Sequence, residues 1–138
     1  MRNAFIEELV GLAKQYPRIA LVVGDLGYSV VEPFADQFPE RFINAGVAEQ
    51  NMTGLAAGMA SEGYHVFTYS IANFPTFRCA EQIRNDVDYH RLPVTVVVFA
   101  DNSLNRIELK QQLIDRGYEE GSIASPGDFV LERAFVEK

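Results

Sequence analysis

Apolar positions recur at helical spacing in the first part of the chain. Within residues 2–15 they fall three or four positions apart, which predicts an amphipathic helix that ends before Pro17: Phe5, Ile6, Leu9, Val10 and Ala13. The same spacing predicts helices over about 48–62 and about 76–88. In the second of these helices, one side carries Phe77, Ala80, Ile83 and Val87.

Continuous apolar runs separate these helices and predict strands. They read "IALVVG" (19–24), the shorter "RFINAG" (41–46), "HVFTYSIA" (65–72) and "PVTVVVFA" (93–100), which is the strongest of the four. Unbroken runs of this kind are typical of strands buried on both faces of a parallel sheet. Beyond them we expect a helix over about 104–114, a loop over 117–127 and a short helix over 129–136 capped by Asp128.

The alternation of strands and helices predicts an α/β fold, with an open, mainly parallel sheet and helices on both faces. No internal repeat or linker interrupts the chain, so we expect one domain over residues 1–138. Ligands of such sheets bind outside the carboxyl ends of the strands. Four segments follow strands at that edge: "GDLGYS" (24–29), "NAGVAEQ" (44–50), "SIANFPTF" (70–77) and "ADNSLN" (100–105).

The composition of the chain limits the kinds of partner and the cellular compartment that we expect. The net charge is −7 and the pI is about 4.8, and no cluster of Lys and Arg marks a nucleic-acid-binding face. No apolar run approaches the roughly 18 residues of a membrane span, and Glu7 and Glu8 interrupt the apolar start, unlike a signal peptide. Cys79 is the only cysteine, so no intrachain disulfide can form. We expect a cytoplasmic protein without a nucleic-acid or membrane partner.

Glu49 is the first candidate for chemistry. An acidic residue in the first turn of a helix commonly complements the helix dipole, which contributes about 0.3–1 kcal/mol. The functional alternative is a carboxyl group held at a strand-to-helix turn, where it can share a proton with a ligand nitrogen. On the same helix, Gly54, Ala57 and Gly58 give a face suited to close contact, and this face predicts a homodimer.

Two aromatic residues follow the third strand. Phe77 is in phase with Ala80 and Ile83, which favours a place in the core, whereas Phe74 precedes Pro75 outside that stripe and is a candidate for stacking on a flat heterocycle. Asp25 and Ser29 lie near a glycine after the first strand, a weak signal.

Two further polar features carry less weight. The triplet "DNS" (101–103) offers oxygen ligands for Mg²⁺, although such a triplet is more often a turn. His65 and His90 show no metal-ligand spacing, and we expect both on the surface.

Three segments together resemble the pyrimidine-binding domain of the transketolase family, over about residues 1–97: "VVGDLGYSV", "FPERFINAGVAEQNMTGLAAGMASEGYHVFTYSIANF" and "FRCAEQIRNDVDYHRLPVTVV". That domain occurs in thiamine diphosphate enzymes and in the separate C-terminal subunit of split transketolases. The resemblance implies that Glu49 hydrogen-bonds the aminopyrimidine ring of the cofactor and promotes the tautomer that activates its thiazolium carbon. It also implies that Phe74 stacks on the pyrimidine, that Phe77 lines the same pocket and that Asp25 lies near the cofactor.

Residues 98–138 are instead similar to the late part of the pyrophosphate-binding domain of thiamine diphosphate enzymes such as acetolactate synthase. This second resemblance implies that Asn102 stands at a Mg²⁺-ligand position, with the Leu104 carbonyl as a second contact. The chain as a whole then looks like a chimera of two related half-domains. It lacks the Gly-Asp-Gly segment that opens the diphosphate and metal site in the family.

The expected function is the pyrimidine-binding component of a transketolase-like enzyme that transfers ketol groups between sugar phosphates. Such a component would be incomplete, and inactive, without a partner subunit that binds the diphosphate. The alternative is a non-catalytic, recombined or engineered α/β domain that keeps the fold but not the activity. Similar pyrimidine domains occur in the β subunit of 2-oxoacid dehydrogenases and in deoxyxylulose phosphate synthase, which stay open as relatives.

Overall fold

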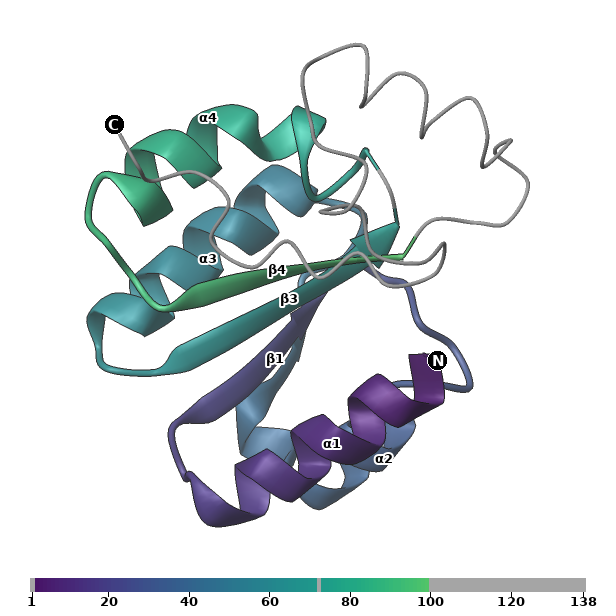
Figure 1. Cartoon of the computed structure of the whole chain (residues 1–138). Coiled ribbons are helices and arrows are strands. Elements are labelled where there is room, and N and C mark those ends of the chain that lie inside the picture. The colour runs from purple at the N-terminus through teal and green to yellow at the C-terminus, as the bar shows by residue number, and fades with distance from the viewer. Residues whose placement is uncertain (1, 72, 100–138) are drawn as a thin grey trace, which may run out of the picture.

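The computed structural model of the chain describes residues 2–71 and 73–99. Four parallel strands form one sheet in the order β2-β1-β3-β4, and helices cover both of its faces (Figure 1). The predicted α/β class is therefore confirmed. The elements in chain order are α1 (Arg2–Gln15), β1 (Ile19–Val23), α2 (Glu32–Gln37), η1 (Pro39–Arg41), β2 (Phe42–Asn44), α3 (Glu49–Ser61), β3 (His65–Ile71), η2 (Phe77–Cys79), α4 (Ala80–Gln82), η3 (Ile83–Asp88) and β4 (Val94–Phe99).

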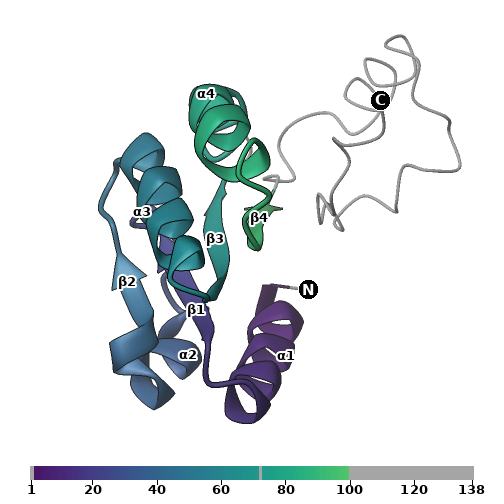
Figure 2. The same ribbon diagram turned by 90° about the vertical axis from the view of Figure 1, so that its left-hand side faces the viewer.

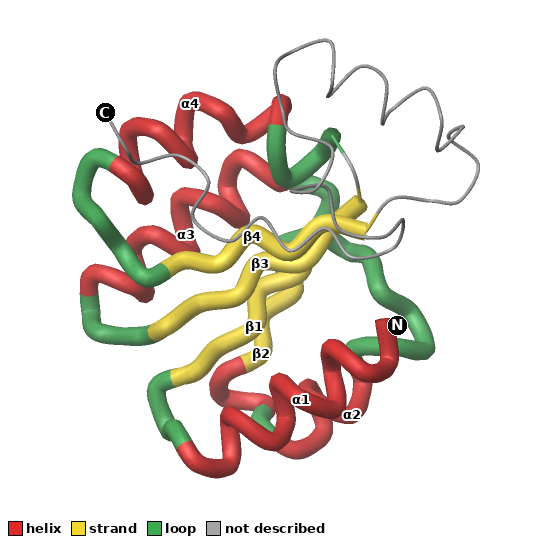
Figure 3. The backbone as a smooth tube through the Cα atoms, viewed as in Figure 1, coloured by secondary structure: helices red, strands yellow, loops and turns green. Residues whose placement is uncertain are grey.

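The sheet forms the middle of three layers. Helices α1 and α2 lie together against one face, and α3 and α4 lie against the other, as the views in Figures 1 and 2 show. The strands run as a single layer between them (Figure 3). Since β1 pairs with β2 on one side and with β3 on the other, the connections after β1 and β2 lead to opposite sides of β1. Such a switch point is where sheets of this kind place a ligand.

Strand β1 is buried on both faces because all five of its residues are apolar. Ile19, Leu21 and Val23 point to the side of α1 and α2, and Ala20 and Val22 point to the side of α3. The alternation follows from the two-residue period of a strand.

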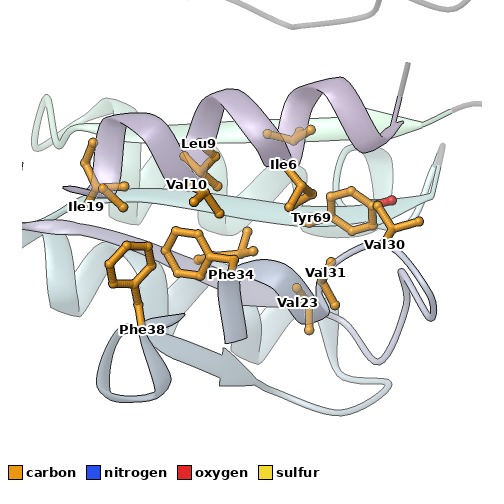
Figure 4. Packing of buried hydrophobic residues seen from close by; sticks show 13 residues of the cluster. Ile6, Leu9, Val10, Ile19, Val23, Val30, Val31, Phe34, Phe38 and Tyr69 are labelled. Carbon is orange, nitrogen blue, oxygen red and sulfur yellow. The ribbon is translucent and has the colours of Figure 1, made fainter. Parts of the chain in front are cut away.

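Of the two apolar clusters among the described residues, the larger lies under α1 and α2 (Figure 4). Phe34 of α2 is fully buried there, and its ring centroid lies 5.1 Å from that of Phe38. Sequence periodicity did not predict α2, because six residues span fewer than two turns and show no repeating stripe. The helix exists because Phe34 anchors it in the core.

The C-terminal end of α1 is closed by a buried arginine. Arg41 Nη1 donates to the carbonyl of Ala13 at 3.1 Å, and its guanidinium lies 4.1 Å from the ring centroid of Phe38. A cation at this place satisfies a free carbonyl and complements the helix dipole.

The helical segment over Phe77–Asp88 changes its winding along its length. It begins as a 3₁₀ turn, passes through one α-helical turn and continues as a π-helix. Because each change shifts the angular phase, the predicted stripe does not hold together: Cys79 and Val87 are buried, but Phe77 is 73% exposed. The prediction that Phe77 belongs to the core is wrong.

The predicted strands over 19–24, 41–46, 65–72 and 93–100 are confirmed within a few residues, as are the helices over 2–15 and 48–62. None of the helices in residues 2–71 and 73–99 is long and apolar enough to cross a membrane. The helices and loop expected beyond residue 100 lie outside the described residues, as do Asn102 and Leu104.

Candidate functional site

Glu49 opens α3, and its side chain lies at the carboxyl end of β1. Only 2% of it is exposed. Gly24, directly after β1, lies against it: a Cβ atom on Gly24 would be in ordinary van der Waals contact, 3.4 Å from both Glu49 Cγ and Ser70 Oγ. The side chain of Glu49 therefore lies at the switch point of the sheet, beside Gly24.

The two carboxylate oxygens of Glu49 differ in their partners. Oε2 accepts a hydrogen bond from Arg78 Nη1 at 2.8 Å. Oε1 is buried and has no hydrogen-bond partner among the described residues, and the same is true of Ser70 Oγ. Because buried polar atoms are nearly always hydrogen-bonded, an unpaired carboxylate oxygen marks a place for a ligand donor.

Arg78 joins Glu49 to an aromatic ring. Its guanidinium carbon lies 4.3 Å from the ring centroid of Phe74, within the range of a cation–π contact. The Phe74 side chain is 38% exposed. The predicted stacking residue and the predicted acid are thus neighbours of one and the same guanidinium group, which brings the two candidates into one site.

Cys79 is buried and holds the segment that carries Phe74 in place. Its thiol donates to the carbonyl oxygen of Phe74 at 3.1 Å. Burial raises the pKa of the Cys79 thiol, so the group stays protonated and serves as a donor.

Asp25 occupies the turn after β1, where its side chain is exposed. It hydrogen-bonds Asn44 at the end of β2, so it belongs to the same sheet edge as Glu49. Asp25 has a φ of 55°, and Gly46 in the next loop has a φ of 72°. Both loops are therefore fixed in left-handed turns beside the site.

The remaining candidate residues either lie apart from Glu49 or fall outside the described residues. Phe77 projects into solvent at the start of η2, and the backbone amide of Ser29 donates to Glu32 Oε1 at 2.7 Å. His65 and His90 are exposed, as predicted. No group of three His, Cys, Asp or Glu side chains is placed to hold a metal ion within residues 2–71 and 73–99.

Sequence reasoning missed Arg78, Asn44 and Ser70. Arg78 follows Phe74 by four positions, and a basic residue one turn after an aromatic residue at a strand end is a signal that could have identified it. Asn44 and Ser70 carry no comparable signal, since each is a single polar residue at the end of a strand.

An open groove of about 490 Å³ lies on the flank of α3, away from Glu49. It is lined by Gly54, Ala57, Gly58, Ser61, Asp86, His90 and Leu92. No atom would lie within 4 Å of a Cβ added at Gly54 or Gly58. The glycine face of α3 is therefore open within the described part of the chain.

These features define an α/β domain with a parallel sheet, a buried carboxylate at the switch point and an aromatic ring beside it, at the sheet edge where folds of this class bind ligands. Residues 1–104 match the family described as "Transketolase, pyrimidine binding domain". The chain belongs to this family, which confirms the resemblance of its first 97 or so residues to the pyrimidine-binding domain.

Similar proteins come from both sequence and structure. A putative transketolase C-terminal section of Methanocaldococcus jannaschii is 47% identical over 98 residues, which cover 70% of this chain and 31% of that protein. A protein described as the 6-deoxy-6-sulfo-D-fructose transketolase subunit SqwH, from a Clostridium species, is 38% identical over 98 residues, covering 70% of this chain and 30% of that protein. A 1-deoxy-D-xylulose-5-phosphate synthase of Mycobacterium avium is 38% identical over 97 residues, covering 68% of this chain and 15% of the synthase.

Among solved structures, a split gene transketolase described as an inactive β4 tetramer is similar, with a TM-score of 0.63 and 41% identity. The match covers 69% of this chain and 32% of that one. The chain thus spans about a third or less of the length of these relatives.

Proposed function

We propose that this chain is the pyrimidine-binding component of a transketolase-like thiamine diphosphate enzyme, and that Glu49 is its catalytic acid. The observation that carries the proposal is the buried, unpaired Oε1 of Glu49 at the switch point of the sheet. The relatives named as transketolase sections and subunits support the class of enzyme.

The residues present fit the aminopyrimidine half of the cofactor. That ring needs a carboxyl group at one edge and a flat surface against one face, and Glu49 and the half-exposed ring of Phe74 offer these two features. Asp25 borders the same edge and would line the pocket. Phe77 is exposed to solvent, and only the family resemblance assigns it to the pocket. When bound, thiamine diphosphate supplies the nucleophilic carbon for transfer of a ketol group.

In this proposal the chain positions and polarises the ring. Glu49 hydrogen-bonds a ring nitrogen and shares a proton with it, while Phe74 fixes the plane of the ring. Burial of Glu49, which is 2% exposed, keeps water from competing for the carboxylate. Mg²⁺ and its ligand Asn102 stay predictions from the sequence.

The chain acts with a partner subunit that binds the diphosphate, and the complex transfers ketol groups between sugar phosphates. Support comes from the solved relative that is described as a split gene transketolase in the form of an inactive β4 tetramer. A second copy of this chain would also pack on the glycine face of α3, giving a homodimer. Light scattering at micromolar concentration tests the homodimer, and a monomer would contradict it.

Isothermal titration of the full chain with thiamine diphosphate and Mg²⁺ tests the site. Glu49→Gln removes a charged hydrogen-bond partner worth about 1.5–3 kcal/mol, so binding should weaken about ten- to a hundredfold. Glu81→Gln, at an exposed position of α4, is the matched control and should bind as the wild type does.

Equal binding by Glu49→Gln and the wild type would exclude the assigned role of Glu49. An absence of binding by every variant would favour the alternative of a domain that keeps the fold without activity. Ketol transfer is then measured in the complex with a diphosphate-binding subunit, where Glu49→Gln should abolish turnover and Glu81→Gln should not.

A further inference from the structure

The guanidinium group of Arg78 makes the two contacts that the proposed site offers to a pyrimidine. It donates from Nη1 to Glu49 Oε2 at 2.8 Å, and it lies 4.3 Å from the centroid of the Phe74 ring. A guanidinium is flat and carries N–H donors at its edge, as an aminopyrimidine does. Arg78 therefore meets both the acid and the ring surface that the ligand would use.

The main chain of Arg78 is fixed more firmly than its side chain. Its carbonyl accepts a hydrogen bond from Gln50 Nε2 at 3.0 Å, and its amide donates to the carbonyl of Asn73 at 3.2 Å. The side chain, in contrast, is 47% exposed, whereas the Glu49 side chain is 2% exposed. The guanidinium can thus leave toward solvent while the backbone around it stays in place.

Glu49, the buried member of the ion pair, is stabilised by any hydrogen-bond donor that takes the place of Arg78. With Arg78 withdrawn, Glu49 would be a buried carboxylate without a counter-ion, which is strongly unfavourable unless another donor arrives. With Arg78 seated, the carboxylate is paired through Oε2, and Oε1 is still without a partner among the described residues. The arrangement favours a ligand that brings its own donor and its own flat ring.

We infer that Arg78 is a placeholder for the aminopyrimidine ring: it holds Glu49 in position in the ligand-free chain and swings out when the ring binds. This inference rests on the proposed function, since it assigns the same pocket to the pyrimidine. A seated guanidinium reduces the fraction of chains that can accept the ring, and it lowers the apparent affinity by that fraction. Arg78 is a positioning residue that sets how tightly the site takes a neutral aminopyrimidine.

Binding of the hydroxymethyl aminopyrimidine that forms half of thiamine tests the exchange. This probe is used at a pH where it is neutral, so that charge repulsion by arginine does not enter. The full, ¹⁵N-labelled chain is titrated and followed by NMR, in the wild type, in Arg78→Met and in Arg84→Met. Arg84 is exposed and lies on the same helical segment, which makes it the matched control. Glu49→Gln is added to each background to verify that binding occurs at Glu49.

Arg78→Met should bind the probe about tenfold more tightly than the wild type, because the half-exposed arginine no longer has to break its ion pair with Glu49 and its cation–π contact with Phe74. Arg84→Met should match the wild type. In the wild-type chain, the Nε–Hε signal of Arg78 should be displaced by the Phe74 ring current and return toward the position of a solvated arginine as the probe is added. This signal reports the exchange directly, even where Arg78→Met fails to fold.

Equal or weaker binding by Arg78→Met, with binding still weakened by Glu49→Gln, would overturn the exchange and leave the pyrimidine site standing. An Arg78 signal that stays in place during saturation of the wild type would overturn it as well. If the probe binds to no variant, the proposed function falls and the exchange falls with it.

Discussion

Asn44 and Asp25 are joined across the ends of two neighbouring strands, with Asn44 Nδ2 donating to Asp25 Oδ1 at 2.9 Å. The amide oxygen of Asn44 accepts two further hydrogen bonds, from the backbone amide of Asp25 at 3.1 Å and from that of Gly46 at 2.9 Å. One side chain therefore ties the turn after β1 to the turn that leads into Glu49.

Asn44→Ala should lower the free energy of unfolding by about 1–2 kcal/mol, because it removes three hydrogen bonds whose net contribution is reduced by their exposure. Urea denaturation measures the difference. Asn51→Ala, at an exposed position within α3, is the control and should change stability by less than about 0.5 kcal/mol. Equal effects of the two substitutions would show that Asn44 does not hold the two turns together.

Glycine at position 27 is required by both conformation and space. Its φ is 98°, and an added Cβ would lie 2.7 Å from Val31 Cγ1 and 2.9 Å from Tyr69 Cε1. Gly27→Ala should therefore destabilise the chain by at least about 1–3 kcal/mol.

Gly11→Ala is the matched control for Gly27→Ala and should have the opposite sign. Gly11 lies within α1, with nothing inside 4 Å of an added Cβ, so alanine should stabilise the helix by about 0.5–1 kcal/mol. Thermal unfolding of both variants compares the signs. A stabilising Gly27→Ala would contradict the packing around the β1–α2 turn.

Glu32 should make the free energy of unfolding depend on pH in the acidic range. Hydrogen bonds from its own backbone amide and from that of Ser29 lower the pKa of the Glu32 carboxyl below its usual value of 4.5. Because the folded pKa is the lower one, the stabilisation is complete above the usual value and is lost as the pH falls through the folded value. Relative to Glu32→Gln, the wild type should lose stability on acidification through this window.

Urea midpoints of the wild type and Glu32→Gln, measured from neutral pH into acid, check this dependence. The same series in roughly 0.5 M NaCl is the control, since short hydrogen bonds persist where long-range charge effects are screened. A difference between the two proteins that does not change with pH would exclude Glu32 as the titrating group.

Cys79 should report the opening of the loop that carries Phe74. Burial raises the pKa of its thiol and hides the sulfur, so a disulfide reagent should react with it at least about tenfold more slowly than with an exposed thiol. A cysteine placed at exposed position 81, in the variant Glu81→Cys/Cys79→Ser, supplies the reference rate. Equal rates would show that the Phe74 loop opens freely.

The strands and α1 could be predicted because their patterns are local and long. Five consecutive apolar residues in β1 and the regular spacing in α1 each indicate one structure without reference to the rest of the chain. The positions of Glu49 and Phe74 at one sheet edge followed from the same reasoning, since the carboxyl ends of parallel strands meet there.

Contacts that depend on the type of helical turn or on which strands pair could not be predicted from the sequence. The 3₁₀ turn at η2 and the π-helix η3 alter the phase on which the placement of Phe77 rested. The same turn aims Arg78 at Glu49, and a pattern of apolar positions contains no information about it. Asn44 likewise acquires its role only after β1 and β2 have paired.

The parallel sheet also has a consequence for how the chain folds. Ile19 pairs with His65 although α2, β2 and α3 lie between them in sequence, so the central pair of strands must close a long loop. Pairings over such separations are slow to form, and they limit the rate of folding. The β1–β3 pair also brings Ser70 next to Gly24, which lies against Glu49, so we expect the slow step in folding to be the step that assembles the site. An early intermediate that holds only α1 and β1 would have no pocket to offer a ligand, and a ligand could stabilise the folded chain without accelerating its formation.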